Sequence, residues 1–112
     1  MTKDKTISII TPAYNEQTNL GLFYERLLQA ISGKDYCVEW IIIDDHSSDE
    51  TFAEIARLAQ ECDWIKGIRL AKNSGSHKAV HCGLKLCSGS CAVVLAADLQ
   101  DPPEKITELV AE

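Results

Sequence analysis

The sequence predicts an α/β fold, in which a parallel sheet of about four strands carries helices on both faces. Short runs of branched apolar residues alternate with segments whose apolar residues recur at helical spacing. Two of the runs, over residues 40–43 and 92–97, are continuously apolar, as expected for strands buried on both faces. Because strands and helices alternate, the strands should run parallel and be joined by right-handed crossovers.

The first half of the chain contains two strand–helix pairs. Residues 6–11 are β-branched and apolar and predict the first strand, which Pro12 is expected to end. The helix expected over residues 17–31 has an apolar stripe at Leu20, Phe23, Leu27, Leu28 and Ile31. The second strand is expected over residues 37–43, and a helix over residues 50–62 follows the polar loop after it.

The second half repeats this pattern. A shorter strand is expected over residues 65–70, and a helix over residues 77–87 follows a turn. The fourth strand is expected over residues 92–97, and a last helix over residues 104–112. The most economical strand order is 3-2-1-4, which places the first and fourth strands side by side at a switch point.

Composition limits the class of protein. The 112 residues suffice for one domain or part of one, and the formal net charge of −6 argues against a nucleic-acid partner. No apolar run approaches the length of a membrane span. The five cysteines are odd in number and form no Cys-x-x-Cys pair. This pattern predicts free thiols in a reducing compartment and therefore a cytoplasmic location.

Polar side chains follow the first, second and fourth strands, whose carboxyl ends should face one cleft. A tyrosine ring can stack on a flat base, and carboxylates accept hydrogen bonds from base N–H groups or ribose hydroxyls. Oxygen ligands after the fourth strand suit Mg²⁺ or Mn²⁺, which would bridge a diphosphate. The side chains are Tyr14 and Glu16, Asp44 and Asp45, and Asp98, Gln100 and Asp101.

Each of these residues also has a purely structural interpretation. Tyr14 could simply pack, and the Asp44–Asp45 pair and Asp101 could cap helices. His77 and His81 stand one helical turn apart, but no third ligand with zinc-site spacing accompanies them. Neither a Gly-x-Gly-x-x-Gly segment nor a P-loop is present, which argues against those two kinds of nucleotide site.

Four ordered motifs resemble glycosyltransferase family 2, and the last is most similar to the polyprenyl-phosphate (dolichyl-phosphate-type) branch. They are residues 9–16 (IITPAYNE), residues 43–51 (IDDHSSDET), Asn73 with Gly75, and residues 97–104 (ADLQDPPE). The resemblance implies the Rossmann-like, nucleotide-binding half of a GT-A domain, a divalent metal and inversion at the anomeric carbon. Residues 1–112 would be the donor-binding part of a longer enzyme.

The resemblance also implies roles for individual residues. Pro12, Tyr14 and Glu16 would line the nucleotide site, and Asp44 and Asp45 would contact the base and ribose. Lys78 would lie near the phosphates, and Asp98 with Gln100 would hold the metal. Many family members have an acidic residue where this chain has Ala96, so only the second carboxylate of an Asp-x-Asp pair remains.

The acceptor half of the family lies beyond residue 112, and no catalytic base is assigned. The expected donor is a UDP- or GDP-linked sugar, and the expected acceptor is a polyprenyl phosphate or a saccharide. A longer chain would then work at the cytoplasmic face of a membrane. Two other interpretations stay open: a nucleotide-binding module without catalysis, and a structural or signalling domain whose acidic residues only cap helices.

Overall fold

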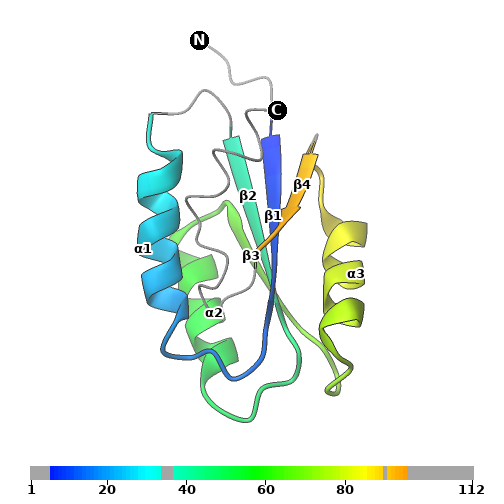
Figure 1. The fold of residues 1–112 in the computed structure, drawn as a ribbon. Coiled ribbons are helices and arrows are strands. Elements are labelled where there is room, and N and C mark those ends of the chain that lie inside the picture. The colour runs from blue at the N-terminus through cyan, green and yellow to red at the C-terminus, as the bar shows by residue number, and fades with distance from the viewer. Residues whose placement is uncertain (1–5, 34–36, 90, 96–112) are drawn as a thin grey trace.

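Four parallel strands form one sheet in the order β3-β2-β1-β4, which confirms the predicted topology (Figure 1). The computed structural model describes residues 6–33, 37–89 and 91–95. The helix expected over residues 104–112 and the motif at residues 97–104 lie outside the described residues. The strands are β1 (Thr6–Ala13), β2 (Cys37–Asp44), β3 (Ile65–Arg69) and β4 (Cys91–Val94).

Within the described residues, three helices cover the two faces of the sheet (Figure 1). Helices α1 (Leu20–Ile31) and α2 (Thr51–Glu61) pack on one face, and α3 (Ser76–Leu86) packs on the other. The reason is the handedness of the crossovers. The first two connections run outward from β1 to β3, whereas the third runs back across the sheet to β4, and right-handed connections in opposite directions use opposite faces.

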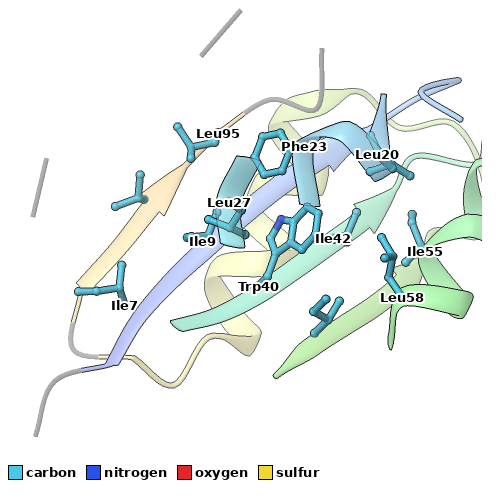
Figure 2. Close-up of a cluster of buried hydrophobic side chains, with 13 residues drawn as sticks. Ile7, Ile9, Leu20, Phe23, Leu27, Trp40, Ile42, Ile55, Leu58 and Leu95 are labelled. Atoms are coloured by element: carbon cyan, nitrogen blue, oxygen red, sulfur yellow. The ribbon is translucent and has the colours of Figure 1, made fainter. Parts of the chain in front are cut away.

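The larger core lies between the sheet and helices α1 and α2, and Trp40 is at its centre (Figure 2). Its ring is fully buried and stacks on Phe23, with 5.0 Å between ring centroids. The indole Nε1 donates a hydrogen bond to Thr11 Oγ1 at 2.9 Å. The one polar atom of this side chain is therefore satisfied, so that its whole apolar area stabilises the sheet.

The smaller core lies between the sheet and α3, and it depends on a close approach of that helix. Ile10, Ile41 and Ile43 pack there against Ala79. A Cβ built on Gly83 would lie 2.5 Å from Ile10 Cγ2 and 2.8 Å from Ile43 Cδ1. Only a glycine lets the backbone of α3 come this close to the strands.

The expectation that Pro12 ends the first strand is wrong, because β1 continues to Ala13 and pairs Pro12 with Ile43. Leu95 N donates to Ile10 O, so the backbone groups of Ile10 face β4. Backbone groups two residues apart in a strand face the same side, and the Pro12 nitrogen therefore also faces the β4 side. The pairing of β4 with β1 ends at Ile10. Proline therefore costs the described ladder no hydrogen bond, and β1 can continue to the carboxyl edge of the sheet.

Other boundaries differ from the expectations by a few residues. The first helix begins at Leu20 rather than at residue 17, because the preceding residues form a turn in which Asn19 N donates to Glu16 O.

Four of the cysteines, Cys37, Cys62, Cys82 and Cys87, are free thiols. In the part of the chain that the structure describes, no helix has the length and apolar character needed to cross a membrane.

A buried carboxylate joins the strands at the opposite, amino edge of the sheet. Glu39 accepts hydrogen bonds from Ser8 Oγ at 2.7 Å and from Ser88 N, Ser88 Oγ and Lys66 Nζ, each at 2.9 Å. Burial raises the pKa of Glu39, but these hydrogen bonds outweigh it and lower the pKa from 4.5 to about 2. The ionised form of Glu39 therefore stabilises the folded state.

The protein should accordingly lose stability in acid through Glu39. Because its folded pKa lies below its unfolded pKa, this contribution is complete above about pH 5 and decreases as the pH falls toward 2, by on the order of 3 kcal/mol. Urea unfolding at pH values from 7 to about 2.5 measures this loss. Glu39→Gln should flatten the profile, whereas Glu61→Gln on the exposed side of α2 should not. An unchanged profile in Glu39→Gln would exclude this carboxylate as the source.

Candidate functional site

The loops that follow β1 and β2 are held together by hydrogen bonds at the carboxyl edge of the sheet. Asn15 N donates to Ser47 Oγ at 2.8 Å, and Ser48 N donates back to Asn15 Oδ1 at 3.0 Å. Glu16 N donates to Thr51 Oγ1 at 2.9 Å. Since all these pairs are more than thirty residues apart in sequence, they fix the position of one loop against the other.

Both loops contain a residue in the left-handed region of backbone conformation. The φ angle is 54° at Asn15 and 61° at His46. Asn15 is a residue type that tolerates this conformation. Histidine is also enriched there, and the Nδ1 atom of His46 lies 3.0 Å from Leu70 O. The two sharp turns cost on the order of 1 kcal/mol each and are maintained by the contacts between the loops.

Asp45 connects the second loop to the start of α3. Its Oδ1 accepts a hydrogen bond from Ser74 N at 2.7 Å, and its Oδ2 accepts one from Gly75 N at 2.9 Å. The side chain of Asn73 donates to the Asp45 carbonyl at 3.3 Å. Gly75, with a φ of 94°, is the residue that caps the helix. The carboxylate therefore sets where α3 begins.

Asp44 has a different environment from its neighbour. It is fully buried, and its Oδ1 accepts hydrogen bonds from the backbone N–H and the hydroxyl of Ser47. Its Oδ2 lies 3.3 Å from Arg69 Nε, and Arg69 Nη2 donates to Ser47 O at 3.2 Å. These contacts show that Asp44 organises the loop after β2, and they are not the helix cap that the sequence offered as its structural interpretation.

A cavity of about 440 Å³ opens between these loops, and we call it the edge cavity. Its volume is within the range of small-molecule sites. Tyr14 is 49% exposed, whereas Asp45 is 5% exposed. No lysine or arginine among the described residues lines it. The lining residues are Pro12, Ala13, Tyr14, Glu16, Asp45, Asn73 and Ser76.

The structure brings four of the candidate residues together and separates two. Pro12, Tyr14, Glu16 and Asp45 line the edge cavity, whereas Asp44 lies behind it in the sheet. Lys78 lines a second cavity of about 710 Å³ along α3, together with His77, His81, Cys82, Lys85 and Leu86. Asp98, Gln100 and Asp101 lie outside the described residues.

Three residues of the edge cavity were not expected from the sequence. Ala13 and Ser76 carry no distinctive chemical signal. Asn73 belongs to a motif that resembles the family, but the loop after β3 was not expected to reach the cleft. It reaches the cavity because Asp45 binds the adjacent backbone N–H groups of Ser74 and Gly75.

The described residues do not by themselves form a metal site. Among them, no group of three histidine, cysteine, aspartate or glutamate side chains could hold an ion, and this includes His77, His81 and Cys82. The edge cavity holds the two acidic side chains Glu16 and Asp45, which suit hydrogen-bond donors of a ligand. A negatively charged group bound beside them would need a cation from elsewhere.

The fold is an open α/β domain, and the edge cavity lies at the carboxyl ends of its parallel strands, where such domains bind ligands. The family model of glycosyl transferase family 2 matches residues 8–112, and the chain belongs to this family. The match includes the β1, β2 and β3 loops that surround the edge cavity.

The relatives are about three times longer than this chain. An undecaprenyl-phosphate 4-deoxy-4-formamido-L-arabinose transferase of Salmonella choleraesuis is 38% identical over 109 residues, which are 96% of this chain and 33% of that protein. A Pyrobaculum calidifontis mannosyltransferase in complex with GDP-Man and Mn²⁺ has a TM-score of 0.78 at 20% identity, over 93% of this chain and 31% of that chain. TarS 1-349 of S. aureus in complex with UDP has a TM-score of 0.69 at 23% identity, over 95% and 31% of the two chains. The two solved structures share the fold with this chain.

Proposed function

We propose that this chain is the donor-binding part of an inverting glycosyltransferase that uses a nucleoside-diphosphate sugar. The observation that carries the proposal is the edge cavity, where Tyr14, Glu16 and Asp45 meet at the carboxyl edge of the sheet in a member of glycosyl transferase family 2. The solved relatives with UDP and with GDP-Man support a nucleotide ligand of this kind.

The edge cavity would bind the base and the ribose. The half-exposed ring of Tyr14 offers a face on which a flat base can stack. Each carboxylate oxygen of Asp45 accepts one backbone hydrogen bond and retains a second acceptor position. Asp45 can therefore hold the α3 loop and also accept from a base N–H or a ribose hydroxyl. In this proposal Asp44 acts through the loop and does not touch the ligand.

The diphosphate would lie outside this acidic pocket and need cations. Lys78 lines the second cavity along α3 and not the edge cavity, and we assign it to the phosphates on the family resemblance. Asp98 and Gln100 would hold Mg²⁺ or Mn²⁺. The chain is still bonded to β1 at Leu95, one residue beyond β4, where Leu95 N donates to Ile10 O. Asp98 is only three residues further along the sequence. The oxygen ligands fit such a cation, which when bound would neutralise charge on the departing diphosphate.

The acceptor in this proposal is a polyprenyl phosphate. The Salmonella relative at 38% identity acts on undecaprenyl phosphate, which supports this choice over a saccharide. A phosphate oxygen is already anionic near pH 7 and needs no strong general base, in keeping with the absence of an assigned base. The complete enzyme would then work at the cytoplasmic face of a membrane.

The isolated chain should bind nucleotide without transferring sugar. A second function, nucleotide binding without catalysis, is favoured for residues 1–112 because this chain matches about a third of the length of the Salmonella relative. Sugar transfer by a chain extended beyond residue 112 distinguishes the two functions. Robust transfer by residues 1–112 alone would contradict the assignment of the acceptor site to the missing part.

Calorimetry with UDP and GDP, in Mn²⁺ and in EDTA, tests the donor site. We expect binding that weakens when the metal is removed, and Asp98→Ala should abolish the metal dependence while changing unfolding by no more than about 0.5 kcal/mol. Asp101→Ala is the matched control, because a helix-capping role would cost about 1 kcal/mol of stability and leave the metal dependence intact. No heat with either nucleotide in folded protein would refute the proposal, and intact metal dependence in Asp98→Ala would refute the ligand assignment.

A further inference from the structure

Arg69 places a positive charge against the buried carboxylate of Asp44. Its Nε lies 3.3 Å from Asp44 Oδ2, and its Nη2 donates a hydrogen bond to the carbonyl of Ser47 at 3.2 Å. The side chain of Asp44 is fully buried, whereas that of Arg69 is 44% exposed. From the end of β3, one guanidinium therefore bridges the last residue of β2 and the loop that follows it.

The Asp44 carboxylate depends on this charge. Its Oδ2 atom is buried and has no hydrogen-bond partner among the described residues, whereas Oδ1 accepts two hydrogen bonds from Ser47. An ionised oxygen without water or a hydrogen bond needs a nearby opposite charge. Without Arg69 this oxygen would be uncompensated, and we expect the carboxylate to turn toward water and away from Ser47.

The backbone around Asp44 is held independently of the guanidinium. Leu70 N donates to Asp44 O at 2.9 Å, and Asp45 N donates to Ala13 O at 2.8 Å. These hydrogen bonds join β2 to its two neighbouring strands and do not involve the side chain of Asp44. The loss of Arg69 should therefore leave the sheet in place and change only the Asp44 side chain and the loop after β2.

Ser47 connects this loop to the edge cavity. Its Oγ atom, which donates to Asp44 Oδ1, also accepts a hydrogen bond from Asn15 N at 2.8 Å. Asn15 has a φ of 54° and directly follows Tyr14, which lines the edge cavity. A shift of Ser47 would therefore release the turn that positions Tyr14.

We infer that Arg69 is a positioning residue of the donor site. Through Asp44 and Ser47 it holds the turn that carries Tyr14, and it thereby sets the affinity for the nucleotide without touching it. The inference rests on the proposed function, because it concerns the ligand of the edge cavity. Arg69 is outside the motifs that resemble the family and outside the described lining of the cavity.

Calorimetry with UDP and GDP in Mn²⁺ tests this role. Arg69→Met removes the charge and the donors at similar side-chain length, and it should weaken nucleotide binding by about tenfold. Arg69→Lys should recover part of the affinity, because an ammonium can approach Asp44 but lacks the fork that also reaches Ser47 O. Measurement well below the unfolding temperature keeps every variant folded, so that a change in global stability alone does not alter the affinity.

Arg57→Met is the matched control. The side chain of Arg57 is 51% exposed, and its ion pairs with Glu54 and Glu61 lie within α2. The same loss of charge there should change nucleotide affinity by less than about twofold, because exposed pairs of this kind contribute little.

Amide hydrogen exchange gives a local measurement that needs no ligand. In Arg69→Met the N–H groups of Asn15 and Ser47 should exchange about tenfold faster, since their acceptors are the Ser47 hydroxyl and the Asp44 carboxylate. The N–H groups of Asp45 and Leu70, which bond to backbone carbonyls of the sheet, should keep their rates.

Two results would overturn the inference while leaving the proposed function intact. One is equal nucleotide affinity in Arg69→Met and Arg57→Met, with a wild-type protein that binds. The other is weaker binding in Arg69→Met with unchanged exchange at Asn15 and Ser47, or with faster exchange throughout the sheet. No binding by the wild-type protein would instead refute the proposed function, and this inference with it.

Discussion

Gly83→Val should be among the most destabilising single substitutions in this protein. Any Cβ at Gly83 would meet Ile10 Cγ2 at 2.5 Å and Ile43 Cδ1 at 2.8 Å, and valine adds two further methyl groups to this contact. Overpacking of this kind costs about 3 kcal/mol, because α3 must move away from the strands or buried side chains must leave their rotamers. Urea unfolding measures the change in the free energy of unfolding.

Gly21→Val is the matched control for this prediction. Gly21 is also inside a helix, but a Cβ there has no neighbour within 4 Å. Valine forms helix slightly better than glycine, so the control should be neutral or stabilising by a few tenths of a kcal/mol. Similar losses at both positions would show that the loss at Gly83 does not come from the close approach of α3 to the sheet.

Asp45→Asn should damage both the fold and the proposed donor site. Asparagine can accept from one of the two backbone N–H groups of Ser74 and Gly75, but its amide nitrogen would then face the other. One buried donor is left unsatisfied, and we expect a loss of about 2 kcal/mol in the free energy of unfolding. Nucleotide binding should fall as well, because the α3 loop lines the edge cavity.

Asp63→Asn serves as the control for charge, because Asp63 is exposed at the end of the helix–strand connection before β3. It should change stability by no more than about 0.5 kcal/mol. Chemical unfolding and calorimetry on the same preparations separate the two effects. If Asp45→Asn unfolds at the wild-type midpoint, the two hydrogen bonds do not hold the loop as described.

The sheet order could be predicted from the sequence because it depends on short-range signals. Apolar runs such as residues 40–43 indicate buried strands whatever their partners are. The handedness and direction of the connections then leave few arrangements, and the order β3-β2-β1-β4 is one of them. The edge of the sheet where the site lies follows from the same rules, so Tyr14, Glu16 and Asp45 could be named as candidates.

Contacts between distant residues decided the rest. Asp44 and Asp45 are adjacent and chemically identical, yet one binds Ser47 and Arg69 behind the cavity and the other binds the α3 loop about thirty residues away. Their residue type does not distinguish them. Neighbouring side chains at the end of a strand point in opposite directions, and the partners that each one meets come from other elements. Pro12 is another example, since it stays inside β1 because the pairing of β4 with β1 ends at Ile10. The sequence determines which side chains reach the edge of the sheet, and only the tertiary structure decides which of them remain available to a ligand.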